Sequence, residues 1–180
     1  MNNQKLNIGI ILGSTREGRV SPQVGEWVKS VADQRNDANY EIVDIKEYHL
    51  PLLGESNDYS NAVKWQKKLS TLDGFIFVTA EYNHSITGAL KNALDSARDE
   101  WNNKAAGVVS YGSVGGARAA EHLRTILGEL QVADVRSQVL LSLFTDFENG
   151  AFKPQSLHLA NLNTLFDQVI KWSTALKSVR

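Results

Sequence analysis

The sequence predicts an α/β fold in which a parallel five-stranded sheet lies between two layers of helices. Strand and helix patterns alternate along the chain, as expected when each strand is followed by a crossover helix. The run from Gly74 to Thr79 is almost continuously apolar, which is typical of a strand covered on both faces. Right-handed crossovers favour a doubly wound sheet, and for 180 residues we expect the strand order 2-1-3-4-5.

Five segments carry strand patterns, and five carry apolar residues at helical spacing. The strands are expected at residues 6–12, 40–45, 74–79, 105–110 and 135–143. The helices are expected to begin at Ser21-Pro22, to surround Trp65, to span 88–97 and 123–130, and to run from about 156 to about 177. In the last helix, the side chains expected to face the core are Leu159, Leu162, Phe166, Val169 and Leu176. Residues 46–60 are expected to form a longer loop, and residues 1–180 a single domain.

The composition indicates a globular protein and excludes several classes of function. Hydrophobic residues make up 42% and charged residues 22% of the chain, and the formal net charge is −1. Nucleic acids and anionic membranes need a basic face, so neither is expected as a partner. Because cysteine is absent, disulfides, thiolate metal sites and a cysteine nucleophile are excluded. The chain start lacks a signal-peptide pattern and no stretch could span a bilayer, so we expect a cytoplasmic location.

The loop after the first strand has the composition of a phosphate-binding loop. Residues 13–21 read G-S-T-R-E-G-R-V-S and lead into a helix, whose N-terminus offers free N–H donors and partial positive charge. Side chains that can add donors are Ser14, Thr15, Arg16, Arg19 and Ser21. Neither the glycine pattern of dinucleotide loops nor the ending of a P-loop is present, which favours a single phosphomonoester. An ordinary surface loop with a serine cap is the alternative.

Two further loops follow the third and fourth strand patterns, and this topology brings all three loops to one edge of the sheet. The second contains E-Y-N-H-S-I-T, whose tip can offer backbone N–H groups and an aromatic face to a flat heterocycle. The third reads S-Y-G-S-V-G-G-A-R, where bare glycine backbone can approach a planar ligand closely. The alternatives are a turn capped by Ser85 or Thr87 and simple loop flexibility.

On these residues the chain resembles the NAD(P)H-dependent FMN reductases of the flavodoxin-like fold, which include quinone, azo-compound and chromate reductases. The matching stretches are GSTREGRVSPQVGEWV, EYNHSITGALKNALD and the glycine loop at 111–116. The middle stretch is quite specific, because that family typically reads P-E-Y-N-x-S-x-x-x-x-L-K-N-A-L-D there. The resemblance implies a three-layer flavodoxin-like fold, bound FMN, and NADPH or NADH as the co-substrate.

The resemblance also implies which residues hold the cofactor. Those implied at the FMN phosphate are Ser14, Arg16, Ser21 and, nearby, Gln23. Those implied around the flavin ring are Glu81, Tyr82, Asn83, Ser85, Ser110, Gly112 and Gly115. Two positions depart from the family pattern. Ala80 replaces a common proline, which makes the turn less rigid, and His84 replaces a common glycine, which puts a titratable ring at the rim.

The activity implied is hydride transfer from NAD(P)H through FMN to an acceptor such as a quinone, azo compound, chromate or free flavin. No side chain is expected to act as a nucleophile, general acid or general base, because the cofactor carries the chemistry. The basic candidates for recognising the NADPH 2′-phosphate are Arg16, Arg19, Lys91 and Arg118. Because family members are usually dimers or tetramers, the resemblance also implies a homodimer or homotetramer.

Three other functions fit the sequence less well. A serine hydrolase would use Ser110, Asp146 and His158, but a nucleophile elbow needs a glycine where Val108 stands. A metal enzyme is disfavoured because the histidines are scattered, and both His122 and His158 are interpreted as helix-surface residues. An FMN-binding electron carrier or regulator without steady NAD(P)H turnover is the non-enzyme alternative.

The tryptophans are interpreted mainly as packing residues. Trp27, Trp65 and Trp172 lie in helical segments, where burial against the sheet explains them. Trp101 follows the third helix in a polar stretch and could instead lie in a subunit interface or beside the flavin of a neighbouring subunit.

Overall fold

A five-stranded parallel sheet forms the centre of the molecule. The computed structural model describes residues 5–180, and its strands are β1 (Leu6–Leu12), β2 (Ala38–Asp44), β3 (Gly74–Ala80), β4 (Lys104–Gly112) and β5 (Val132–Ser142). Their order is β2-β1-β3-β4-β5, which confirms the predicted order 2-1-3-4-5. The register places Ile10 of β1 level with Ile42 of β2 and Ile76 of β3, so that all three carboxyl ends reach one edge.

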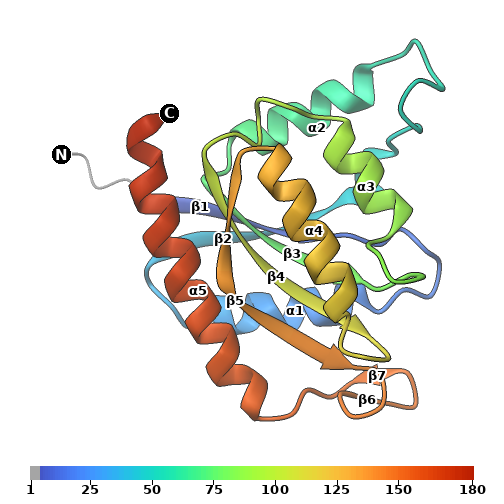
Figure 1. The fold of residues 1–180 in the computed structure, drawn as a ribbon, viewed down its shortest axis with the longest axis vertical. Helices are drawn as coiled ribbons and strands as arrows, with labels where there is room; N and C mark the ends of the chain where they lie inside the picture. Colours follow the sequence, from blue (N-terminus) through green and yellow to red (C-terminus); the bar gives the residue numbers. More distant parts are fainter. Residues whose placement is uncertain (1–4) are drawn as a thin grey trace.

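Helices cover both faces of the sheet, as Figure 1 shows. One face carries α1 (Ser21–Ala32) and α5 (Leu157–Leu176), and the other carries α2 (Ser60–Ser70), α3 (Gly88–Asp95) and α4 (Ala117–Glu129). Each face has its own apolar core, and every residue of β3 and β4 is buried. The doubly wound, three-layer α/β fold is therefore confirmed. Within the described residues, no helix combines the length and the apolar character needed to cross a membrane.

Two connections and the segment after α5 contain short elements that the sequence patterns did not predict. They are the 3-10 helices η1 (Ile45–Tyr48) and η2 (Lys177–Val179) and the strands β6 (Phe147–Glu148) and β7 (Ala151–Phe152). The two short strands pair as an antiparallel hairpin after β5. This hairpin packs on α1, where the rings of Trp27 and Phe152 lie 5.5 Å apart, and so extends the core beyond the sheet.

The predicted inner face of the last helix is partly wrong. Leu159 and Trp172 are each 47% exposed, although we expected both to pack inward. The side chains that α5 buries are His158, Leu162, Leu165, Phe166, Val169 and Ser173. In place of Leu159 and Trp172, the neighbouring polar residues His158 and Ser173 face the core. Gly74 of β3 makes room for this packing, because a Cβ there would clash with the Ser173 hydroxyl.

Trp101 belongs to the core and not to a surface. Its ring is fully buried, packs 5.0 Å from the ring of Phe75 and 5.9 Å from that of Trp65, and donates its Nε1–H to the Leu94 carbonyl at 3.1 Å. A buried indole needs such a partner for its N–H. The suggestion that Trp101 lies in a subunit interface or beside a neighbouring flavin is therefore wrong.

Candidate functional site

Three loops meet at the carboxyl edge of the sheet, as the topology predicted. The first loop is defined as residues 13–20, the second as 81–87 and the third as 113–116. The first and second loops touch through Ser14 and Tyr82, whose hydroxyl oxygens are 3.2 Å apart. The second loop joins the end of β4, where the Glu81 N–H donates to the Tyr111 carbonyl at 2.9 Å. The site is therefore one continuous surface built from three separate parts of the chain.

The first loop gathers hydrogen-bond donors around one point. The Ser14 hydroxyl and Nε of Arg16 each lie 3.2 Å from the Tyr82 phenol oxygen. Ser21 is fully buried at the start of α1, where its hydroxyl lies beside the Tyr111 phenol and forms no hydrogen bond of good geometry within residues 5–180. No side chain caps the N-terminus of α1, so its backbone N–H groups remain available there. This donor set fits the phosphate of a mononucleotide.

Arg19 braces the first loop, whereas Arg16 remains exposed. The Arg19 guanidinium makes a two-point ion pair with Asp44 at the end of β2, with Nη1 2.6 Å from Oδ1. It also donates to the Ser14 carbonyl at 2.5 Å. The hydrogen bond to Asp44 raises the pKa of Arg19 above its usual value. Arg16 forms no ion pair within the described part of the chain, so it is the loop cation that can face a ligand.

The second loop ends in a tight turn with free backbone donors. Tyr82 and Ser85 exchange two backbone hydrogen bonds of 2.9 and 3.0 Å across the turn. Asn83 and His84 between them have φ values of 48° and 68°, the left-handed conformation that asparagine tolerates well. Between described residues, the N–H groups of Asn83 and His84 make no hydrogen bond. These exposed donors can therefore serve the edge of a flat heterocycle.

Thr87 is the cap that begins α3, which confirms one of the two residues expected to cap this helix. Its hydroxyl oxygen accepts from the Leu90 N–H at 3.0 Å, and the same hydroxyl donates to the Gly13 carbonyl. Thr87 thus ties the second loop to the first. Ser85, the other predicted cap, instead has its hydroxyl 3.1 Å from Nδ1 of His122 on α4.

The glycines of the third loop are required by the packing of the protein itself. Gly115 and Gly116 both have positive φ, at 72° and 73°. A Cβ at Gly116 would lie 2.7 Å from the Tyr111 nitrogen, and one at Gly115 would lie 2.8 Å from the Leu140 side chain. Ser110 is fully buried behind this loop and donates to the Gly115 carbonyl at 2.9 Å. The loop is therefore held in one conformation.

Glu81 connects the second loop to α4 through a buried carboxylate. The side chain is 4% exposed and is paired with Arg118 at the start of α4. Burial alone would raise the pKa of Glu81, but hydrogen bonds from Arg118 and from the N-terminus of α4 outweigh burial and hold the pKa below its usual value. Glu81 is therefore a carboxylate at neutral pH.

The structure brings most of the predicted cofactor residues to one place. Those at the meeting point of the three loops are Ser14, Arg16, Ser21, Glu81, Tyr82, Asn83, Ser85, Gly112 and Gly115. Gln23 is used differently: its Oε1 accepts from the Phe152 N–H at 2.8 Å and its Nε2 donates to the Gly150 carbonyl at 3.4 Å. Both ends of this amide hold the β6–β7 hairpin, so contact with a phosphate stays a prediction. Sequence reasoning missed Asp44, because its partner became known only when β2 was placed beside β1.

The hydrolase arrangement does not form. Nε2 of His158 lies 2.9 Å from Oδ1 of Asp146, but the Ser110 hydroxyl is bonded to a backbone carbonyl instead. His158 is only 6% exposed, so its interpretation as a helix-surface residue is wrong. Asp146 explains this burial, because its carboxylate also accepts the N–H groups of Ser142 and Gln155 at 2.8 and 3.0 Å and so closes the segment around the hairpin.

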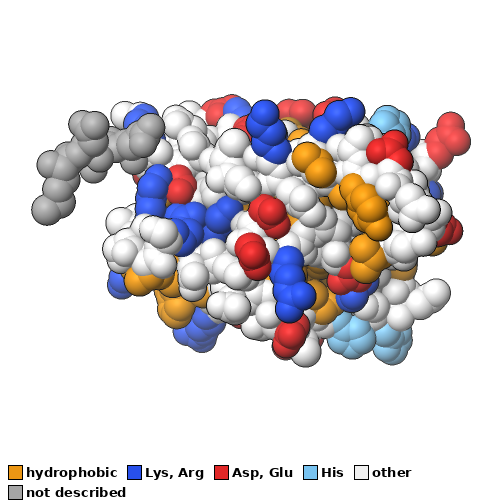
Figure 2. Space-filling model, turned by 90° about the horizontal axis from the view of Figure 1, so that it is seen from above, with side chains coloured by type: hydrophobic (Ala, Val, Ile, Leu, Met, Phe, Trp, Pro, Cys, Tyr) orange, Lys and Arg blue, Asp and Glu red, His pale blue; other side chains and the backbone are white. Residues whose placement is uncertain are grey.

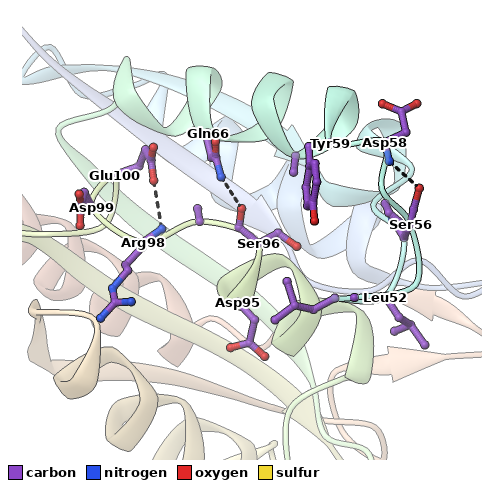
Figure 3. Close-up of a pocket in the computed structure, with 15 residues that line it drawn as sticks. Leu52, Ser56, Asp58, Tyr59, Gln66, Asp95, Ser96, Arg98, Asp99 and Glu100 are labelled. Atoms are coloured by element: carbon purple, nitrogen blue, oxygen red, sulfur yellow. Dashed lines mark hydrogen bonds between the residues drawn. The ribbon is translucent and has the colours of Figure 1, made fainter.

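Two cavities lie on the side of the sheet covered by α2 and α3, and none of the predicted cofactor residues lines either of them. Figure 3 shows the first, of about 320 Å³, where Tyr59 at the start of α2 and Leu52 face the end of α3 at Asp95 and Ser96. The second, of about 380 Å³, shares Leu52 with the first and reaches Thr15 of the first loop. The surface between η1 and α3 is thus hollowed from the first loop outward.

The fold and the three loops together define a flavodoxin-like mononucleotide-binding protein. Residues 6–146 match the NADPH-dependent FMN reductase family. The chain therefore belongs to the NADPH-dependent FMN reductase family, and it is an oxidoreductase that uses FMN and NAD(P)H. This assignment favours an enzyme over an electron carrier or regulator.

The sequences of several reductases are similar to this chain over most of its length. An NAD(P)H-dependent FMN reductase of Schizosaccharomyces pombe is 31% identical over 88% of this chain and 86% of its own length. A quinone reductase of Escherichia coli is 32% identical over 69% of this chain and 70% of its own. Among solved structures, the flavoenzyme NAD(P)H:(acceptor) oxidoreductase FerB of Paracoccus denitrificans superposes with a TM-score of 0.77 at 18% identity. It covers 94% of this chain and 98% of the other, which supports the flavodoxin-like fold.

Proposed function

We propose that FMN binds across the three loops and that the protein passes electrons from NAD(P)H to a small quinone-like acceptor. The observation that carries this proposal is the convergence of the Ser14 hydroxyl and Arg16 on one point, in the loop that leads to the uncapped N-terminus of α1. The Ser21 hydroxyl, buried beside the Tyr111 phenol without a hydrogen bond of good geometry, adds a donor that a ligand can satisfy.

In this proposal each loop has a separate task. Ser14, Arg16, Ser21 and the N-terminus of α1 hold the phosphate through charge-assisted hydrogen bonds. The free N–H groups of Asn83 and His84 meet the edge of the flavin ring, and the fixed glycines of the third loop form the opposite wall. FMN, when bound, supplies the redox chemistry, and the chain binds and orients it.

A small acceptor suits the open rim of the site. Tyr82 is 37% exposed and His84 is exposed, so the tip of the second loop remains open to solvent. Relatives named quinone reductase and 2-hydroxy-1,4-benzoquinone reductase make a planar quinone the first acceptor to test. Three of the four basic candidates for the NADPH 2′-phosphate are held in ion pairs, namely Arg19, Lys91 and Arg118.

Anaerobic reduction tests the proposed function. The protein loaded with FMN is mixed with NADPH or NADH, and the absorbance of the bound flavin is followed before and after a quinone is added. We expect the flavin to bleach with at least one of the two coenzymes and to regain its colour with the quinone. Binding of FMN without bleaching would favour the carrier or regulator instead.

We further propose that residues 1–180 form one FMN-binding domain of a homodimer or homotetramer in the cytoplasm. Several large apolar side chains are exposed around the first cavity, and such patches often mark protein interfaces; they are Leu52, Leu53, Tyr59 and Val63. On the face seen in Figure 2, charges of both signs are interspersed, which argues against a nucleic acid partner. Light scattering after gel filtration would measure the oligomeric state, and a monomer would contradict this part of the proposal.

A further inference from the structure

The carboxylate of Glu81 is bound entirely by the start of α4. Nε of Arg118 donates to Oε1 at 2.6 Å, and Nη2 of the same residue donates to Oε1 as well. The backbone N–H groups of Arg118 and Ala119 reach Oε2 at 3.0 and 3.4 Å. One side chain of the second loop therefore takes the place of a helix N-cap for α4, although it lies 37 residues earlier in the chain.

The backbone of Glu81 is held just as closely to β4. Its N–H donates to the Tyr111 carbonyl at 2.9 Å, and a Cβ on Gly112 would approach the Glu81 Cβ to 3.0 Å. Glu81 thus contacts both β4, which precedes the third loop, and α4, which follows it. Any change in the separation of the second and third loops must break several of these contacts.

Arg118 extends the connection to the tip of the second loop. Its Nη1 lies 2.8 Å from Nε2 of His84, and because arginine has no acceptor, this histidine nitrogen must accept the hydrogen bond. The Arg118 side chain is 39% exposed, so its far end lies at the rim of the site, while its partner carboxylate is buried. Arg118 therefore holds both the start and the tip of the second loop.

We propose that Glu81 and Arg118 are a positioning pair that fixes the spacing of the two flavin-ring loops and cancels charge beside the flavin. This inference rests on the proposed placement of FMN. Neither residue needs to touch the ring, because the pair acts through the turn at Asn83 and through the third loop. A buried carboxylate left without its cation, or the cation left without its carboxylate, would place a net charge within the ring site, where low dielectric strengthens its effect.

Removing the charge of Glu81 and removing that of Arg118 should shift the midpoint potential of bound FMN in opposite directions. Reduction adds negative charge to the flavin, so an unpaired Arg118 favours the reduced form and an unpaired Glu81 disfavours it. Glu81→Gln should therefore raise the midpoint potential of bound FMN, and Arg118→Gln should lower it. The double variant should return close to the wild-type potential, because the net charge is restored.

The test is a double-mutant cycle on FMN-loaded protein, read as midpoint potential against reference dyes and as the FMN dissociation constant. Each single variant should also weaken FMN binding by about tenfold, the scale of coupling expected within one hydrogen-bonded network. Lys29→Gln is the matched control, because it removes the cation of another surface ion pair, Lys29–Asp33, in the last turn of α1 and outside the loops. It should leave both the potential and the FMN affinity near those of the wild type.

Single-variant shifts of the same sign, or shifts no larger than that of the control, would overturn the inference. If Glu81→Gln does not fold, Arg118→Gln and the conservative Arg118→Lys decide alone, because Arg118 is partly exposed. Arg118→Gln must lower the midpoint potential, and Arg118→Lys must keep it close to that of the wild type. Failure of the FMN site itself is distinguishable. In that case Arg16→Ala would leave FMN affinity unchanged, whereas failure of the pair alone leaves the Arg16 effect intact.

Discussion

The two edges of the sheet use polar residues in opposite ways. At the carboxyl edge, Arg16 is exposed and lies outside any ion pair of the described chain. At the amino edge, the buried carboxylate of Asp73 accepts from the Asn7 N–H at 2.9 Å, from Lys177 at 2.9 Å and from Arg180 at 3.0 Å. The cations around Asp73 at the amino edge are thus paired within the protein, whereas the cation Arg16 at the carboxyl edge is left to meet a ligand. Substitutions at the amino edge should therefore change stability more than FMN binding, and substitutions at the carboxyl edge should do the reverse.

The largest expected effect is at the amino edge. Asp73→Ala leaves one backbone N–H and two cations without their acceptor, so we expect the free energy of unfolding to fall by about 2–3 kcal/mol, since both cations keep some exposure to water. Urea unfolding measures this loss, and fluorescence titration should give the wild-type FMN affinity. A drop in FMN affinity as large as the loss of stability would break the comparison.

The same carboxylate makes stability depend on acid. Burial alone would raise the pKa of Asp73, but hydrogen bonds from Lys177 and from the Asn7 N–H lower it below its usual value. The folded state thus releases this proton more readily than the unfolded state, whose pKa is about 3.9. The contribution is fully present above that value and is lost as the pH falls through the folded-state pKa. Asp73→Ala should lack this part of the acid sensitivity.

At the carboxyl edge, Arg16→Ala should weaken FMN binding and leave stability alone. The loss of charge-assisted hydrogen bonds to the phosphate is worth about 1.5–3 kcal/mol. Riboflavin, which lacks the phosphate, is the matched control ligand and should bind the variant and the wild type equally. Because Arg16 is exposed, the urea midpoint should change little. An equal loss for both ligands would remove Arg16 from the phosphate site.

Lys104, at the amino edge of β4, should make stability depend on pH in the alkaline range. It is 5% exposed, donates to the Leu69 carbonyl at 2.8 Å and lies 5.5 Å from the centre of the Phe75 ring. Burial lowers the pKa of Lys104 to about 8. The unfolded chain then binds more protons between pH 8 and about 10.4, so the stability of the wild type should rise across this window, by at most about 1.4 kcal/mol per pH unit. Lys104→Met should lack this rise, and a parallel rise in both proteins would contradict the assignment.

Tyr82→Phe should have the smallest effect. Without FMN, the Tyr82 phenol oxygen occupies the donors of Ser14 and Arg16 that we assign to the phosphate. Removing this competitor should strengthen FMN binding by about 0.5–1 kcal/mol, the net value of a hydrogen bond. Isothermal titration would measure the change. Weaker binding would show that the hydroxyl holds the ligand instead of competing with it.

Much of the fold could be predicted because it depends on local patterns. Alternating elements and apolar strands such as β3 predict the order of the sheet and the meeting of the three loops. The orientation of α5 could not be predicted, because His158 and Ser173 are buried only through partners in distant elements, Asp146 and Gly74. Local periodicity favours leucine and tryptophan over these polar residues.

In the site, too, the features that depend on local sequence could be predicted, and those that depend on distant partners could not. The residue types of the three loops could be predicted from composition and resemblance. The ion pairs of these loops could not be predicted from the sequence. Arg16 and Arg19 lie in the same loop, and Arg19 pairs with Asp44 only because β2 lies beside β1. Glu81 and Arg118 are likewise paired by the spacing of two loops and not by a sequence pattern.

A crystal structure of the FMN complex tests the central claim most directly. The account predicts the phosphate within hydrogen-bond distance of the Ser14 and Ser21 hydroxyls and of Arg16, with the flavin ring between the turn at Asn83 and the third loop. A phosphate bound away from the first loop, or FMN seated in the cavity beside Tyr59, would contradict it.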